Sequence, residues 1–233
     1  MVHVALITYT PDPERTIAVA ARVSVSAVGI SQLSEKLTPE MVKRLIDRLI
    51  SSGHLSPFEH VNFTFAIEGI SRVTSHQLVR HRIASYTQQS QRYVSFRKFD
   101  YVTPPTISAK AELKAKYHQT VSDAHRLYVE MLDAGIPAED ARYVLPGAAE
   151  TILVMTMNAR ELMHVCSLRL CLKAQWEIVA LFGKIKDEVE KVAPRIAAEL
   201  KPKCYQLGYC DEAKSCGLFP TAAEIQAKKP GNQ

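Results

Sequence analysis

The stretch Arg80-His-Arg-Ile-Ala-Ser-Tyr-Thr-Gln-Gln-Ser-Gln-Arg-Tyr93 concentrates side chains that bind anions and polar rings. Its fourteen residues include three arginines, one histidine, three glutamines, two serines and one threonine. Arginine presents a planar fork that matches phosphate and carboxylate oxygens, while glutamine and serine both donate and accept, which suits the mixed edge of a pyrimidine ring. No apolar periodicity follows Ile83. We therefore expect a loop, and a polar loop this dense in directional donors predicts a binding site.

The net charge of the chain is +5, and much of the excess crowds between Arg72 and Lys98. A local basic patch indicates an anionic partner, either a nucleic acid, a phosphorylated small molecule or an acidic cofactor. Neither a Gly-x-Gly-x-x-Gly fingerprint nor a phosphate loop occurs in the sequence. Side chains would therefore have to hold any nucleotide phosphates. A solvated basic turn is the plainer alternative.

A nucleic-acid-binding module is the rival function from another class. It predicts steeply salt-dependent binding to oligonucleotides and no bound chromophore. The aromatic residues near the basic stretch, Tyr86, Tyr93 and Phe96, form no regular stripe of the kind that single strands stack on. This pattern favours small-molecule ligands and no nucleic-acid partner, although the residues alone leave the alternative open.

The elements that must position these side chains follow from periodicity and capping residues. A short apolar run predicts a strand over 2–9, alternation of apolar and polar residues predicts one over 61–67, and 151–157 is read as a buried strand. Helices are predicted over 14–23, 39–50, 71–82, 109–134, 137–143, 158–170 and 175–200, with Pro194 kinking or interrupting the last one. Strands and helices do not alternate regularly, which favours an α+β fold with a mixed sheet and flanking helices. We expect a single domain over residues 1–200 and a cysteine-containing tail over 201–233.

The composition is that of a soluble globular protein, with 47% hydrophobic and 23% charged residues in 233. The N-terminus lacks the features of a signal peptide and no apolar run is long enough to span a membrane, so we expect a cytoplasmic protein with no membrane partner.

The chain has five cysteines, an odd number that argues against a disulfide framework. Cys166 and Cys171 fall in a helical pattern and are interpreted as small core residues. Cys204, Cys210 and Cys216 are evenly spaced in the tail but form no Cys-x-x-Cys pair, which is a weak zinc signal. We predict no metal site.

The basic stretch resembles the signature loop of flavin-dependent thymidylate synthases. The shared pattern is Arg-His-Arg-x-x-Ser, followed after four residues by Ser-x-Arg-Tyr. It is formed here by Arg80, His81, Arg82, Ser85, Ser90, Arg92 and Tyr93. Further segments are similar to elements of the same family in the same order: Gly53–His60, Ala141–Pro146, and Asn158–His164 followed by Leu168-Arg169 and Gln175–Ile178. The resemblance covers roughly residues 20–200.

The resemblance implies reductive methylation of dUMP to dTMP, with FAD as cofactor, 5,10-methylenetetrahydrofolate as one-carbon donor and NADPH as reductant. It implies a homotetramer whose subunits share each site. The FAD-binding residues that it implies are His54, Ser56, Arg80, His81, Arg82, Gln88, Asn158, Arg160 and His164. The dUMP-binding residues that it implies are Gln77, Arg80, Gln88, Gln89, Ser90, Gln91, Arg92, Arg142 and Arg169.

The resemblance makes Arg169 the catalytic residue, facing the uracil ring. A permanently protonated guanidinium there would stabilise negative charge at N3 and O4 and raise the nucleophilicity of C5 without a covalent enzyme nucleophile. Ser90 and Arg92 suit the monophosphate. His54 is expected to hold a position near the flavin, and His164 is read either as a ligand or as a core histidine. Glu177 is read as a solvated residue or a structural ion-pair partner.

One departure from the family pattern is Thr87-Gln88, where an Asn-Glu pair is common. Glutamine keeps hydrogen-bonding capacity but loses the negative charge, so no proton step is assigned to this position. A relative that only binds flavin nucleotide and has lost catalysis is a further alternative.

Overall fold

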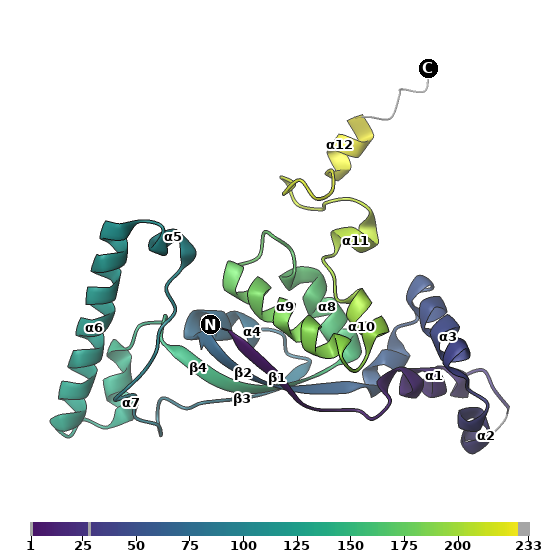
Figure 1. The fold of residues 1–233 in the computed structure, drawn as a ribbon, viewed down its shortest axis with the longest axis horizontal. Helices are drawn as coiled ribbons and strands as arrows, with labels where there is room; N and C mark the ends of the chain where they lie inside the picture. The colour runs from purple at the N-terminus through teal and green to yellow at the C-terminus, as the bar shows by residue number, and fades with distance from the viewer. Residues whose placement is uncertain (1, 28, 228–233) are drawn as a thin grey trace. The chain divides into compact units, whose positions relative to one another are not determined.

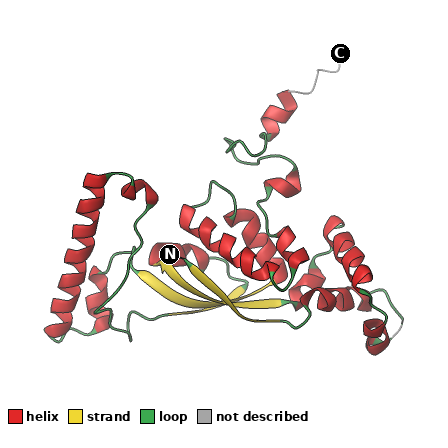
Figure 2. Ribbon diagram, viewed as in Figure 1, coloured by secondary structure: helices red, strands yellow, loops and turns green. Residues whose placement is uncertain are grey.

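The computed structural model describes residues 2–27 and 29–227. Four strands form one sheet in the order β1-β2-β4-β3, drawn in yellow in Figure 2. Their bounds are β1 His3–Tyr9, β2 Asn62–Ser71, β3 Ala84–Gln88 and β4 Glu150–Asn158.

The chain divides into two compact units. The first unit contains the residues up to His3, Ala66–Arg82 and Tyr86–Met155. The second unit contains Val4–Phe65, Ile83–Ser85 and the described residues from Thr156.

The strands pair antiparallel, whereas we expected a mixed sheet. The amide of Ala159 donates to Val61 beside one end of β2, and the amide of Arg72 donates to Ala149 beside the other, so β4 runs against β2. Strand direction depends on which ends meet in space, and periodicity carries no information about it. The α+β class itself is confirmed.

Alternation explains the two central strands. Phe63, Phe65 and Ile67 of β2 are fully buried at every second position, and the two phenyl rings stack with centroids 6.3 Å apart. Leu153 and Met155 repeat the pattern in β4. Both strands were predicted, although β2 extends further than expected.

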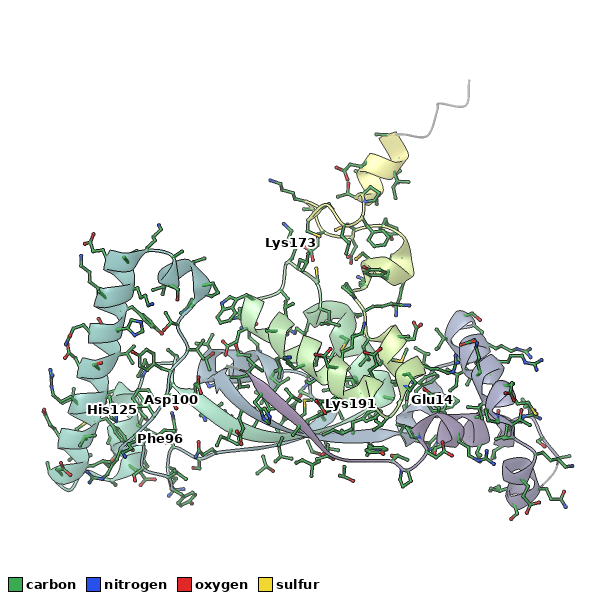
Figure 3. All side chains as sticks on the ribbon, in the orientation of Figure 1. Glu14, Phe96, Asp100, His125, Lys173 and Lys191 are labelled. Carbon is green, nitrogen blue, oxygen red and sulfur yellow. The ribbon has the colours of Figure 1, made fainter. Side chains whose placement is uncertain are left out.

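The helices of the first unit, with the short 3-10 helix η2, are α4 Arg72–Leu78, α5 Pro105–Ser108, α6 Ala111–Asp133, α7 Ala138–Ala141 and η2 Arg142–Val144. The long helix α6, teal in Figure 1, was predicted almost to its bounds. Its Tyr128 is buried and the hydroxyl accepts from the amide of Phe96 at 3.0 Å, while His125 Nε2 lies 3.0 Å from the carbonyl of Phe96 (Figure 3). The segment after Tyr93 is therefore fixed against α6.

The second unit contains α1 Pro13–Val23, α2 Ile30–Glu35, α3 Pro39–Ser51, η1 Ser56–His60, α8 Ala159–Arg169, α9 Trp176–Glu190, α10 Pro194–Glu199, α11 Cys204–Leu207 and α12 Ala222–Ala227. Thr38 caps α3 by accepting from the amide of Met41 at 3.3 Å, as predicted. The predicted long C-terminal helix is interrupted before Pro194, which begins α10 because proline is tolerated in a first turn.

The short helix η1 is held by Phe58, which is fully buried. It packs on both α1 and α8 within the second unit. Its neighbour Glu59 is consequently presented toward the first turn of α8, where a functional cluster was predicted.

The predicted loop over residues 80–93 is wrong in part, because Ala84–Gln88 forms β3. Ala84, Tyr86 and Gln88 are half-buried, and the intervening residues are exposed. The Tyr86 hydroxyl donates to the carbonyls of Leu78 and His81, at 3.1 and 2.9 Å. The inward face of this strand is polar and satisfied by tertiary hydrogen bonds, so it lacks the apolar alternation on which the prediction depended.

Two residue assignments are also corrected. Glu177 is only 2% exposed, so its reading as a solvated residue is wrong; it lies in the first turn of α9, where a helix favours a carboxylate. Cys171 lies beyond the end of α8 and is half-buried, so it is not the helical core residue we expected. Cys166 is fully buried in α8, and this interpretation is confirmed.

No helix within the described ranges is both long and apolar enough to cross a membrane. The domain bounds at residue 200 stay a prediction.

Candidate active site

A cleft of about 620 Å³ opens beside the first turns of α8. We call it the α8 cleft, and all of its lining belongs to the second unit. The lining residues are Leu55, Glu59, Ile83, Asn158, Arg160, Glu161, Met163, His164, Ser167 and Gln206. Three predicted cofactor-binding residues meet here, namely Asn158, Arg160 and His164.

The start of α8 explains why these three side chains share the cleft. Asn158 caps the helix, since its Oδ1 accepts from the amide of Glu161 at 2.8 Å. Arg160 and His164 follow four residues apart and therefore project from one helix face. His164 is exposed on the cleft, so its alternative reading as a core histidine is wrong.

Arg160 forms an ion pair with Glu59, and both side chains are about half exposed. The carboxylate holds the guanidinium against the cleft while leaving part of its donor fork open to solvent. The cleft thus combines a cation, an imidazole and a helix N-terminus with apolar walls from Leu55, Ile83 and Met163. This donor set fits an extended anionic cofactor with a hydrophobic ring system.

Glu161 is a lining residue that sequence reasoning missed. It is 8% exposed, and burial raises the pKa of its carboxyl above the ordinary value of 4.5, while nearby His164 lowers the pKa in part. The folded state therefore holds this proton to a higher pH than the unfolded state does. As a consequence, the free energy of unfolding decreases as the pH rises from the ordinary value through the folded pKa.

Replacing Glu161 with glutamine is expected to remove this pH-dependent loss, because the amide keeps the shape without a buried charge. At about pH 8 the variant should have the larger free energy of unfolding, and the two proteins should converge below the ordinary carboxyl pKa. Urea unfolding across that pH range measures the difference. Glu190→Gln, at an exposed position of α9, is the matched control. If the free energy of unfolding depended on pH in the same way in Glu161→Gln and wild type, the raised pKa of Glu161 would be contradicted.

The other predicted residues of the second unit lie outside the α8 cleft lining. His54 is exposed and its Nδ1 lies 2.9 Å from the Ser52 hydroxyl, which orients the ring. Ser56 is exposed at the start of η1. Arg169 is half-buried in the last turn of α8, where a cation complements the helix dipole. Their contacts with ligands stay predictions.

The first unit contains a second group of candidate side chains, which we call the arginine cluster: Arg72, Arg92 and Arg142. Arg92 Nε lies 2.5 Å from a carboxylate oxygen of Glu139, and Arg142 Nε donates to the Glu139 carbonyl at 2.9 Å. The pKa of Arg72 is lowered, first by burial and then by the positive charge of Arg142. Two guanidinium groups that repel each other are stabilised by an added anion.

The turn that carries Arg92 is built by Ser90. The Ser90 hydroxyl accepts from the amide of Arg92 at 3.1 Å, and the amide of Val94 donates to the Ser90 carbonyl at 3.0 Å. The guanidinium lies 5.2 Å from the centre of the Tyr93 ring, a cation–π contact. Serine and arginine are thereby presented together, as phosphate binding requires.

Gln88 and Gln89 connect this turn to the sheet. The Gln88 amide nitrogen donates to the hydroxyls of Ser75 and Thr151, at 2.9 and 3.0 Å. The Gln89 carbonyl accepts from Arg72 at 3.3 Å, and its side chain lines a separate cavity of about 380 Å³ in the first unit. The amide of Gln88 therefore has a structural role, because it connects β3 to Ser75 of α4 and to Thr151 of β4.

The remaining predicted residues of the first unit surround the end of α4. Gln77 is half-buried in α4, and Arg80 and Arg82 are exposed just after it, while His81 between them is buried. Gln91 is half-buried in the turn before Arg92. Sequence reasoning did not assign Arg72 or Glu139 to the site. Arg72 belongs to the basic stretch that the sequence singled out. Glu139 lies outside that stretch, and only the fold brings it to Arg92.

Comparison with known proteins gives one consistent result. The sequence profile of the thymidylate synthase complementing protein family matches residues 5–195. The chain is 49% identical over 226 residues to a flavin-dependent thymidylate synthase of Geobacter sulfurreducens, covering 96% of both chains. It is 46% identical over 220 residues to one of Pyrococcus abyssi, covering 91% of this chain and 90% of the relative.

A similar solved structure is the UMP/dUMP methylase PolB of Streptomyces cacaoi, bound with 5-Br dUMP. It has a TM-score of 0.73 and 26% sequence identity, and the match covers 85% of this chain and 94% of that chain.

Proposed function

Because the chain belongs to the flavin-dependent thymidylate synthase family, we propose that it converts dUMP to dTMP by reductive methylation. In this proposal 5,10-methylenetetrahydrofolate donates the carbon, NADPH is the reductant and tetrahydrofolate is released. The observation that carries the proposal is that one chain presents two groups of side chains suited to anions, the α8 cleft and the arginine cluster.

The α8 cleft is the proposed site of FAD. Arg160 and the N-terminus of α8 favour the pyrophosphate charge, while His164 supplies a ring donor or acceptor beside it. The apolar side chains of Leu55, Ile83 and Met163 exclude water from a ring system. FAD, when bound, supplies the hydride chemistry, and the residues of this chain orient it and offset its charge.

The arginine cluster is the proposed site of the dUMP phosphate. Arg92, Arg142 and Ser90 present donors from one turn and one 3-10 helix, and the half-buried Arg72 adds charge behind them. The carboxylate of Glu139 holds Arg92 in place until a phosphate competes for it. Arg169 is the proposed catalytic residue, which stabilises negative charge on the uracil ring.

A homotetramer with shared sites is part of the proposal. Tyr93 and Tyr143 are 79% and 84% exposed, and both adjoin residues assigned to dUMP. Large aromatic side chains that remain this exposed on a single chain are typical of surfaces that a partner covers. Light scattering during size-exclusion chromatography measures the mass directly. We also propose a cytoplasmic location, which suits the free thiols of Cys166, Cys171, Cys204, Cys210 and Cys216.

The experiment that tests the function starts from purified protein reconstituted with FAD and desalted. We expect a retained flavin absorption band that shifts when dUMP is added. We further expect dTMP to form only when methylenetetrahydrofolate and NADPH are both present. Retained flavin without dTMP would identify a relative that binds the nucleotide but has lost catalysis. A colourless protein with salt-dependent oligonucleotide affinity would instead support the nucleic-acid alternative.

A further inference from the structure

Four of the five cysteines gather around one small cavity in the second unit, of about 90 Å³. They are Cys171, Cys204, Cys210 and Cys216. Cys171 comes from the loop after α8, Cys204 begins α11, and the other two follow in the tail. The cavity therefore brings together residues that are far apart in the sequence, and no sequence periodicity predicts that they meet.

The four cysteines belong to the lining of this one cavity. Cys210 is 8% exposed, and its amide donates to the Pro220 carbonyl at 2.7 Å. All four are free thiols, whereas the fifth, Cys166, is buried in the core of α8.

The tail that carries three of these cysteines has almost no hydrophobic core of its own. Cys210 is the one buried residue in the described range 201–227. An edge-to-face contact between Tyr205 and Phe219, with centroids 5.2 Å apart, is its main aromatic packing. Small folded segments with so little buried apolar surface are usually stabilised by disulfides, a metal ion or oligomerisation.

A zinc ion fits this donor set better than any other link. Four thiolates are a complete ligand set for structural zinc, which is tetrahedral and needs no redox partner. Lys173, labelled in Figure 3, lines the cavity with Lys203, and these cations offset the charge of a tetrathiolate. Two carboxylates also line it, of which Asp211 is paired with Lys203 and Glu212 is exposed.

The four cysteines line one cavity but do not adopt this arrangement in the structure. Over the described ranges, no three His, Cys, Asp or Glu side chains stand as a group that could hold a metal ion. Glycines with positive φ at positions 208 and 217 flank the segment that carries Cys210 and Cys216, with φ of 73° and 97°. These turns allow the sulfurs to move inward when an ion draws them together.

We propose that Cys171, Cys204, Cys210 and Cys216 form a tetrathiolate zinc site that fastens the C-terminal tail to the end of α8. Each thiol gives up its proton to solvent as a sulfur–zinc bond replaces a zinc–water bond, so no oxidant or reductant is needed. This proposal replaces our expectation that the chain has no metal site. It does not depend on the proposed function.

The site has a consequence for the α8 cleft. The amide of Lys203 donates to the Ser167 carbonyl at 3.0 Å, and Ser167 lines both the cleft and the cysteine cavity. Gln206 of α11, two residues after Cys204, lines the cleft. Zinc would therefore position Gln206 at the cleft wall, and its loss should weaken FAD retention as a secondary effect.

The test is the zinc content of full-length protein, expressed with added zinc and purified in reductant without a chelator. We expect about one zinc ion per chain by mass spectrometry of the metals, and severalfold less in Cys204→Ser and Cys216→Ser. Cys166→Ala is the matched control, since this cysteine lies outside the cavity, and it should keep the zinc. Equal zinc content in wild type and the three variants would show that the metal is an adventitious ion only and would overturn the proposal.

Two further measurements keep the test decisive if a serine variant does not fold. Wild-type protein treated with a thiol reagent should release zinc in step with modification of the tail cysteines, detected by a chromophoric chelator. Protein isolated without metal should take up zinc chloride against that chelator, and failure to do so would contradict the site. Stoichiometric iron with sulfide, or tail thiols already oxidised to disulfides on rapid alkylation, would also overturn it.

Discussion

Replacing Arg169 with alanine is expected to lower kcat for dTMP formation by about 10²- to 10³-fold, the usual cost of removing one charge-stabilising donor. In the proposed reaction the negative charge at N3 and O4 of uracil exists only as C5 becomes nucleophilic. The guanidinium therefore stabilises the transition state more than it stabilises bound dUMP.

The position of Arg169 separates this effect from cofactor binding. It lies in the last turn of α8 and is absent from the lining of the α8 cleft. FAD retention should accordingly change by less than about twofold, because the substitution removes no side chain that lines the cleft. Steady-state kinetics and the flavin absorbance after desalting measure the two quantities.

Arg169→Lys is the informative control, because lysine keeps the charge but loses the planar fork. We expect its kcat to lie between those of wild type and the alanine variant. If Arg169→Ala turned over dUMP at the normal rate, Arg169 would have no role in the chemistry. If Arg169→Ala lost both the bound flavin and turnover, the role of Arg169 would be structural.

The second large effect is expected at Arg92. Loss of a charge-assisted hydrogen bond costs about 1.5–3 kcal/mol, so Arg92→Ala should raise the KM for dUMP by about 10- to 150-fold. At saturating dUMP the kcat should be nearly normal, since the phosphate is held equally in the ground and transition states.

Arg97 provides a matched control from the same basic stretch. Its guanidinium pairs with Asp133 at 2.8 Å and is about as exposed as that of Arg92. Arg97→Ala removes the same charge without touching the arginine cluster, so the KM for dUMP should stay close to wild type. A normal KM in Arg92→Ala, or an equal rise in both variants, would reject the phosphate assignment in favour of a general effect of charge.

Much of the fold could be predicted because its signals are local. Thr38 before a helical apolar pattern, and proline in the first turn of α1, act through the backbone groups beside them. The buried alternation in β2 and β4 reflects the geometry of a single strand. The family could also be recognised, since the signature loop is a short run of residues at fixed spacing.

Two of the errors, at Gln88 and Glu177, have a common cause, which is that burial of polar groups depends on distant partners. Gln88 fills the inner face of β3 because Ser75 and Thr151 accept its amide hydrogens. Glu177 reads as a surface residue in an amphipathic pattern, yet it is buried in the first turn of α9. Neither outcome follows from residues adjacent in the chain.

By itself the sequence determined the α+β class, the approximate bounds of α1, α3, α6 and α8, the family and the side chains available for anion binding, because these depend on residue type and short-range spacing. Only the tertiary structure decided which charges meet. It brought Glu139 to Arg92, Glu59 to Arg160, and Cys171 to the three cysteines of the tail. Such contacts join residues tens of positions apart. Their formation depends on how buried surfaces pack together, and this information is distributed over the whole chain rather than written in any one segment.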